Sequence, residues 1–148
     1  QQIINRADDI HRCSDEGLQA IVDGYMRLNT VCLPNGHYRI EEGSEHYLFY
    51  ELEERLGRPF IHGWIVGLGV YCLSRLQDHR AEEMTDFMNR VGLKYDPKVM
   101  EIRPEDLRAA LLNLKTFVES RPKLWYTVIN ERPIEPVWVD QTLSGLVF

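Results

Sequence analysis

The stretch that decides the fold is Trp64-Ile65-Val66-Gly67-Leu68-Gly69-Val70-Tyr71-Cys72-Leu73. Its apolar residues would face every side of a helix, which is typical of a helix that is buried all round. A β-strand is the alternative, because the stretch contains several β-branched residues. The length of the element, from about Ile61 to Gln77, and its lack of alternation favour the helix. Gly67 and Gly69 each lower helix stability, and we expect them to permit the close approach of another helix or a ligand.

Helical periodicity, bounded by capping residues and turns, recurs along the rest of the chain. These signals place further helices over about 15–33, 44–56, 81–91, 104–120 and 137–148. Residues 125–129 are rich in β-prone side chains, and we expect an extended loop there. Glu51, Glu53 and Glu54 are interpreted as a solvated helix face. Five or six helices without alternating strands predict an all-α fold, a single helical bundle forming one domain over 1–148.

Composition excludes several classes of protein. The chain has 148 residues, of which 44% are apolar and 27% are charged, as in an ordinary globular domain rather than a disordered segment. No apolar run approaches the roughly 20 residues that a membrane-spanning helix needs. The formal net charge of −6, and the absence of basic clusters interleaved with aromatic residues, argue against a nucleic-acid partner.

The cysteines indicate a reducing compartment. Cys13, Cys32 and Cys72 are odd in number and widely spaced, and the chain contains no Cys-x-x-Cys motif. This pattern argues against a disulfide framework and against a zinc ribbon. The first residues do not form a signal peptide, so we expect a cytoplasmic protein. Because the chain does not begin with methionine, we expect it to be a piece of a longer protein.

Two histidines are the candidate ligands. His46 and His62 each lie at the start of an expected helix that is otherwise apolar. They would be far apart in an antiparallel helix pair, but they would converge if residues 57–60 turned one helix across the other. Two imidazoles are too few for a closed metal site, so a third ligand would be needed. The alternative, which spacing alone favours, is that both histidines cap helices or lie in the core.

The order of several short motifs resembles one enzyme family. Glu42-Gly43-Ser44-Glu45-His46 resembles the Ser-Gly-Ser-Glu-His box of glycerol-1-phosphate dehydrogenases. The run from Gly57 to Gly63, followed by Val66-Gly67-Leu68-Gly69, resembles the second histidine box and glycine-punctuated helix of that family. Arg121-Pro122 followed by Tyr126-Thr127-Val128-Ile129 is similar to its late segment, so the resemblance covers nearly the whole chain. Iron-containing alcohol dehydrogenases, glycerol dehydrogenases and 3-dehydroquinate synthases share the two boxes.

The resemblance implies a particular architecture. Enzymes of this superfamily combine an N-terminal α/β domain that binds NAD(P) with a C-terminal all-α domain that carries a divalent metal. This chain resembles the C-terminal domain alone, as found in the dehydroquinate synthase-like fold. The N-terminal nucleotide-binding domain of the same protein is therefore its implied partner.

The resemblance also implies a ligand set. The family binds its metal, here zinc, nickel or iron, through one aspartate and two histidines, and His46 and His62 occupy the two histidine positions. The aspartate lies farther upstream than this chain reaches, so Asp8 and Asp9 are not substitutes. The metal polarises the hydroxyl or carbonyl oxygen of a small polyol or phosphorylated substrate. The hydride goes to the nicotinamide held by the other domain.

Two residues depart from the family pattern. Tyr50 stands where the family often has a further histidine, and Trp64 stands where it usually has glutamate after His-Gly. Both positions are expected inside the substrate pocket. Tyr50 is the candidate catalytic residue, because its hydroxyl can donate a hydrogen bond, although it is a poor proton shuttle. These departures imply an altered substrate, a divergent subfamily or a lost activity, and we expect the isolated chain to be inactive.

Three functions remain open from the sequence. The first is the metal-binding domain of a glycerol-1-phosphate dehydrogenase-like oxidoreductase. The second is part of a carbocycle-forming sugar-phosphate synthase of the dehydroquinate synthase type. The third is a degenerate, non-catalytic association module, in which an exposed apolar face would drive the formation of homo-oligomers.

Overall fold

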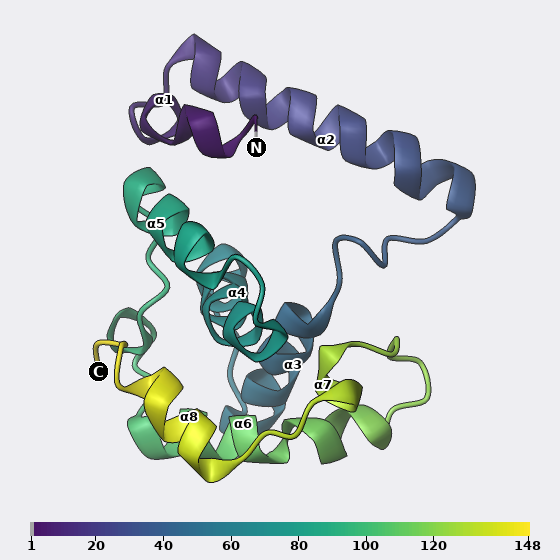
Figure 1. The fold of residues 1–148 in the computed structure, drawn as a ribbon, viewed down its shortest axis with the longest axis vertical. Helices are drawn as coiled ribbons and strands as arrows, with labels where there is room; N and C mark the ends of the chain where they lie inside the picture. The colour runs from purple at the N-terminus through teal and green to yellow at the C-terminus, as the bar shows by residue number, and fades with distance from the viewer. Residues whose placement is uncertain (1) are drawn as a thin grey trace. The chain divides into compact units, whose positions relative to one another are not determined.

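The computed structural model describes residues 2–148 and contains helices but no strand in that range (Figure 1). The elements are η1 (Ile4–Arg6), α1 (Ala7–His11), α2 (Asp15–Asn35), α3 (Ser44–Leu56), α4 (His62–Gln77), α5 (Ala81–Val91), η2 (Pro97–Met100), α6 (Pro104–Glu119), α7 (Val128–Glu131) and α8 (Pro136–Leu143). The all-α prediction is therefore confirmed. The described residues contain more helices than the five or six predicted, because short elements such as α1 and α7 carry little periodic signal.

Local chemistry sets the ends of the long helices, as the sequence predicts. The Ser14 hydroxyl accepts a hydrogen bond from the backbone N–H of Gly17 at 3.2 Å and so caps the start of α2. Gly36 ends this helix with φ of 65°, and Gly57 ends α3 with φ of 62°. Both values lie in the left-handed region that favours glycine.

Two predictions near the C-terminus are wrong in part. The extended segment stops at Thr127, because this residue starts the short helix α7 with a capping box. The Thr127 hydroxyl accepts from the Ile129 backbone N–H, and the Asn130 side chain accepts from the Thr127 backbone N–H. The last helix is also shorter than predicted, since it begins at Pro136 and ends at Leu143.

The chain packs into two compact units. The first contains residues up to Glu42 together with Glu82–Leu93, and thus η1, α1, α2 and most of α5. α1 packs closely on α2, because a Cβ at Gly17 would lie 2.4 Å from the carbonyl oxygen of Asp9. The ion pair between Asp8 and Arg90 joins α1 to α5 within this unit. The side chains of its small core are Ala7, Ala20, Cys32 and Met88.

The second unit contains Gly43–Ala81 and Lys94–Phe148. Its helix α3 packs against both α4 and α6, and α7 and α8 pack against α6 (Figure 1). The fully buried leucine and isoleucine side chains of this unit are Leu48, Leu52, Ile65, Leu68, Ile102, Leu107, Leu111, Leu114 and Ile129. Most residues of α4 from Ile65 to Leu76 are buried, which confirms that the stretch quoted first forms a core helix.

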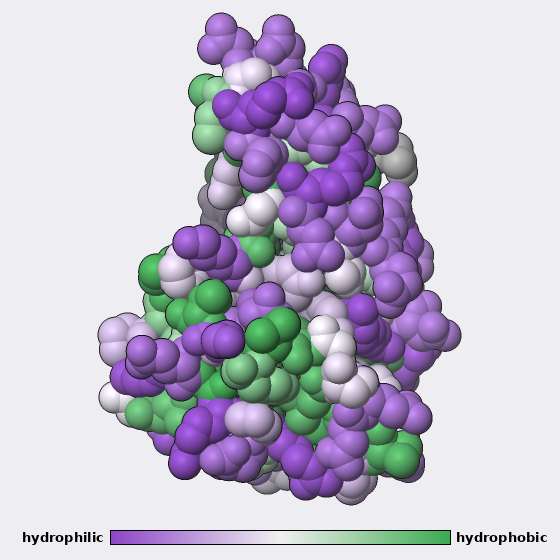
Figure 2. Space-filling view, turned by 90° about the vertical axis from the view of Figure 1, so that its left-hand side faces the viewer, coloured by the Kyte–Doolittle hydropathy of each residue, from purple (hydrophilic) through white to green (hydrophobic). Residues whose placement is uncertain are grey.

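The surface of the second unit also carries exposed apolar side chains. On the face shown in Figure 2, hydrophobic residues gather in the lower part of the view. Val99, Val137 and Val147 are among the exposed large hydrophobic residues of this unit.

In the described part of the chain, no helix is both long and apolar enough to cross a membrane.

Candidate metal-binding site

The site is built where α4 crosses the first turn of α3. A Cβ placed on Gly69 would lie 2.4 Å from the carbonyl oxygen of Glu45, so no larger residue fits between the two backbones. Gly69 thus permits the close approach of another helix, one of the two roles predicted for it. His62 lies two helical turns before Gly69 and therefore on the same face of α4, about 10 Å along the helix axis from this contact.

The two candidate histidines converge. The ring centroids of His46 and His62 are 5.2 Å apart, with an interplanar angle of 45°. Phe49 packs its ring edge-to-face against His62, with centroids 5.3 Å apart at 82°. His46 is buried, with 9% of its surface exposed, whereas His62 is exposed. The pair therefore combines one enclosed imidazole with one that is open to solvent.

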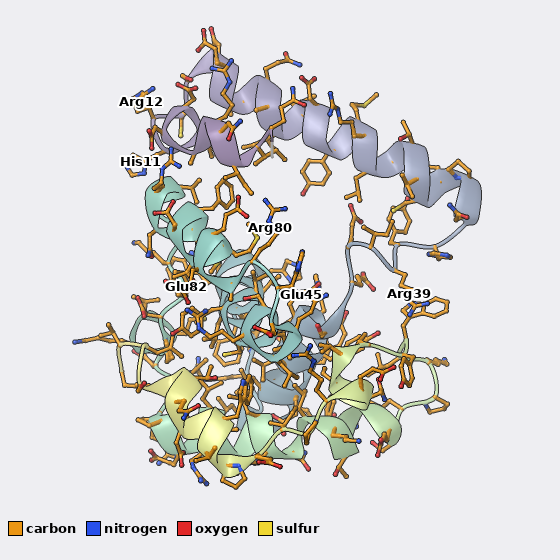
Figure 3. The ribbon with its side chains drawn as sticks, viewed as in Figure 1. His11, Arg12, Arg39, Glu45, Arg80 and Glu82 are labelled. Atoms are coloured by element: carbon orange, nitrogen blue, oxygen red, sulfur yellow. The ribbon has the colours of Figure 1, made fainter. Side chains whose placement is uncertain are left out.

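A carboxylate orients the buried ring. Glu45, labelled in Figure 3, lies in the first turn of α3, and its Oε1 is 2.9 Å from Nδ1 of His46. The backbone N–H of Gly43 donates to the same oxygen, also at 2.9 Å. Burial opposes the ionised form of Glu45, but hydrogen bonds from His46 and from backbone N–H groups outweigh it and hold the pKa of this carboxyl below its usual value.

This arrangement has the chemistry of an incomplete metal site. Metal-binding histidines commonly donate their second ring N–H to a carboxylate, as His46 is placed to do toward Glu45. Imidazole nitrogen suits zinc, nickel and iron. Within residues 2–148, however, no group of three or more His, Cys, Asp or Glu residues could hold a metal ion. The donors thus fit a divalent metal in kind, and they supply two of the three or four ligands that such a site needs.

The aspartates near the N-terminus have other partners. Asp9 accepts hydrogen bonds from Arg6 at 3.0 Å and from Arg12 at 2.7 Å. Asp8 accepts from Arg90 at 3.2 Å. Arginine therefore engages both carboxylates.

Comparison with known proteins shows a distant relative. The chain is 24% identical over 131 residues to the glycerol-1-phosphate dehydrogenase [NAD(P)+] of Thermococcus kodakarensis. The match covers 88% of this chain and 36% of that enzyme, so the chain spans about a third of the length of the curated relative it matches. No model of a protein family matches the chain. The similarity supports a related, dehydrogenase-like family.

Tyr50 belongs to the cluster of rings around the histidines. Its ring centroid is 6.3 Å from that of His46 and 5.1 Å from that of Phe49. Its ring also stacks on that of Tyr47, with the centroids 6.4 Å apart, and Tyr47 is almost fully buried. The i, i+4 spacing of α3 thus brings the candidate catalytic tyrosine next to His46.

Trp64 contributes to a hollow that the two histidines do not line. It helps to line a hollow of about 190 Å³ with Phe60, Val99 and Met100, and neither histidine contributes to that lining. The ammonium group of Lys94 lies 5.4 Å from the centroid of its ring. The residue that stands in place of the family's glutamate thus lines this hollow, and the expectation that it also lies inside the substrate pocket stays a prediction.

Glu51 is the polar residue that the sequence interpretation missed. It is only 2% exposed, although it was expected on a solvated face. Arg55 binds its carboxylate at 2.6 and 3.2 Å, and the Asn113 amide donates to it at 3.1 Å. Arg55 lies four residues after Glu51, so this ion pair could have been predicted from the helical spacing. Asn113 lies 62 residues after Glu51, and no local pattern indicates that contact.

Proposed function

We propose that this chain is the metal-binding helical domain of a longer, NAD(P)-dependent polyol or glycerol-1-phosphate dehydrogenase-like oxidoreductase. The observation that carries the proposal is the convergence of His46 and His62, with Glu45 hydrogen-bonded to the more buried ring. The distant similarity to an enzyme whose name includes both the substrate and NAD(P)+ supports it.

In the proposed site, His46 and His62 hold the divalent metal together with at least one ligand from outside the described residues. When bound, such a metal polarises the hydroxyl or carbonyl oxygen of the substrate. Glu45 keeps the His46 ring oriented, and Phe49 covers one side of His62. The nicotinamide cofactor is assigned to the N-terminal domain of the longer protein.

Tyr50 is proposed to contact the substrate. Its phenol can donate a hydrogen bond to an oxygen atom bound beside the histidine pair. Such a hydrogen bond would fix the position of a hydroxyl group of the substrate. This role would select substrates with a second oxygen next to the reacting one, as polyols have.

Calorimetric titration of the chain with Zn²⁺ or Ni²⁺ tests the proposal. We expect weak binding, because two histidines leave the site open, and a loss of at least about tenfold in affinity in the double variant His46→Ala/His62→Ala. The matched control is His37→Ala/His79→Ala, which removes two imidazoles elsewhere and should bind as the unaltered chain does. Equal loss in both double variants would overturn the proposal.

An association module is the second candidate, favoured by the exposed apolar side chains of α2. Leu18, Val22, Tyr25 and Met26 recur at helical spacing and are 52%, 54%, 61% and 65% exposed. Under this function the chain should form oligomers in sedimentation experiments, and Val22→Glu/Met26→Glu should abolish them. A chain that remains monomeric at high concentration would contradict it.

A further inference from the structure

We propose that Glu45 is a positioning residue that fixes the neutral His46 ring as the tautomer with hydrogen on Nδ1. This keeps Nε2 of His46 unprotonated and available to a ligand. The inference deepens the proposed function and rests on it for its biological meaning, but it can be tested on the metal-free chain.

The carboxylate of Glu45 is held in place by Gly43. The backbone N–H of Gly43 donates to Oε1 of Glu45 at 2.9 Å. A Cβ on Gly43 would lie 2.8 Å from Oε2 of the same carboxylate. Glycine at this position therefore supplies a hydrogen bond and also the space in which the carboxylate lies.

The backbone of Glu45 is fixed by α4. Its carbonyl oxygen and Cα would be 2.4 and 2.9 Å from a Cβ on Gly69. A backbone held this closely by a neighbouring helix has little freedom to shift. The acceptor for the His46 ring is thus fixed by contacts on both its side chain and its main chain.

The tautomer follows from the chemistry of the acceptor. An ionised carboxylate accepts hydrogen bonds and cannot donate them, so the contact of 2.9 Å requires the hydrogen to be on Nδ1 of His46. A neutral imidazole carries one hydrogen, which leaves Nε2 with a free lone pair. Metal binding at Nε2 would then require neither a change of tautomer nor the loss of a proton from that nitrogen.

Nitrogen-15 NMR of the histidine side chains tests this directly. In the metal-free chain at about pH 8.5, where an unperturbed imidazole is neutral, we expect His46 to show a protonated Nδ1 and an unprotonated Nε2. His37 provides an internal reference for the opposite tautomer, because its Nδ1 accepts from the backbone N–H of Arg39 at 3.4 Å. A protonated Nε2 on His46 in the unaltered chain would overturn the inference.

Variants at Glu45 separate positioning from folding. Glu45→Ala removes the acceptor and should shift His46 toward the Nε2–H tautomer, with a loss of about 10- to 100-fold in Zn²⁺ affinity. Glu45→Gln keeps an oxygen acceptor and should retain the Nδ1–H form. Glu42→Ala removes an exposed carboxylate from the same segment and should change neither readout. An unchanged tautomer in a folded Glu45→Ala chain would overturn the inference.

The two readouts distinguish this inference from the proposed function. If His46 has the expected tautomer but the chain binds no Zn²⁺, Glu45 still fixes the ring and the metal-binding proposal fails. If Zn²⁺ binding depends on His46 and His62 but His46 in the metal-free chain is the Nε2–H tautomer, the proposed function stands and the role of Glu45 is overturned.

Discussion

The three cysteines differ in their surroundings, and this difference predicts their reactivity. Cys13 is exposed, whereas Cys32 and Cys72 are buried. Burial raises the pKa of the Cys72 thiol to about 12, so almost none of it is the reactive thiolate at neutral pH. We therefore expect one fast-reacting thiol in the folded chain at pH 8, measured with a chromogenic disulfide reagent.

The substitution Cys13→Ser provides the control for thiol reactivity. It should remove the fast phase completely, and unfolding in denaturant should expose the two remaining thiols. A fast phase that persists in folded Cys13→Ser would show that the buried cysteines are more accessible than the structure indicates.

The capping of a helix by a neighbouring residue could be predicted from the sequence, whereas side-chain contacts that depend on the fold could not. Ser14 caps α2 through a residue three positions later, so its role could be read from the sequence. The burial of Glu51 depends on Asn113, and no local pattern reveals that partner. Glu45 was placed in the motif, but its hydrogen bond to the adjacent His46 ring depends on backbone geometry that the sequence does not specify.

At the scale of the elements, the crossing of α3 and α4 decides the site. The sequence left two arrangements of these helices open, one of which would have separated the histidines. The close contact between Gly69 and the Glu45 backbone fixes where α4 crosses the start of α3, and in that arrangement the His46 and His62 ring centroids lie 5.2 Å apart. The glycine within a buried helix predicted the close approach of another helix or a ligand at Gly69. Only the structure shows that the group in contact is the backbone of Glu45.

Two glycines of α4 give a matched test of this crossing. A Cβ on Gly69 would meet the Glu45 backbone at 2.4 Å, whereas a Cβ on Gly63 would meet nothing within 4 Å. We expect Gly69→Ala to destabilise the chain by about 2 kcal/mol or more, since overpacking forces backbone shifts. Gly63→Ala should be neutral or stabilising by up to about 1 kcal/mol, because alanine favours helix. Urea denaturation would measure both, and equal effects would contradict the described crossing.

The ion pair between α1 and α5 predicts a dependence on pH. The hydrogen bond and charge of Arg90 hold the pKa of Asp8 below its usual value. Because the pKa is lower in the folded state, this pair stabilises the fold above the ordinary carboxyl pKa of about 3.9, and the contribution is lost as the pH falls through the lower folded value.

The variant Arg90→Ala tests that dependence. It should be slightly less stable than the unaltered chain at pH 7, and the difference should shrink as the pH falls below about 4. Thermal denaturation across this range gives the comparison. A difference that grows toward acid pH would contradict the sign of the pKa shift.

At the scale of the whole molecule, the candidate site lies within one unit. His46, His62, Glu45 and Gly69 all belong to the unit made of Gly43–Ala81 and Lys94–Phe148. The geometry of the histidine pair is therefore set by that unit alone. The chain matches 36% of the length of its Thermococcus relative, and the proposal assigns the remaining ligand and the nicotinamide cofactor to the rest of the longer protein.

The fold class could be predicted from the periodicity of the long helices, because α3 and α6 bury apolar residues whose helical spacing is visible in the sequence. The division into two units could not, because it depends on which helices pack together after the turn at Gly36. The histidine pair was identified as a ligand candidate mainly through its motifs. Its geometry required the structure, since the two residues lie on different helices.

Anomalous diffraction from crystals of the chain grown with Co²⁺ tests the central claim most directly. The account predicts a cobalt peak within about 2.0–2.2 Å of a ring nitrogen of both His46 and His62, with Nε2 as the ligand atom of His46. The peak should be absent from crystals of His46→Ala/His62→Ala. Cobalt bound elsewhere while the space between these two rings stays empty would contradict the account.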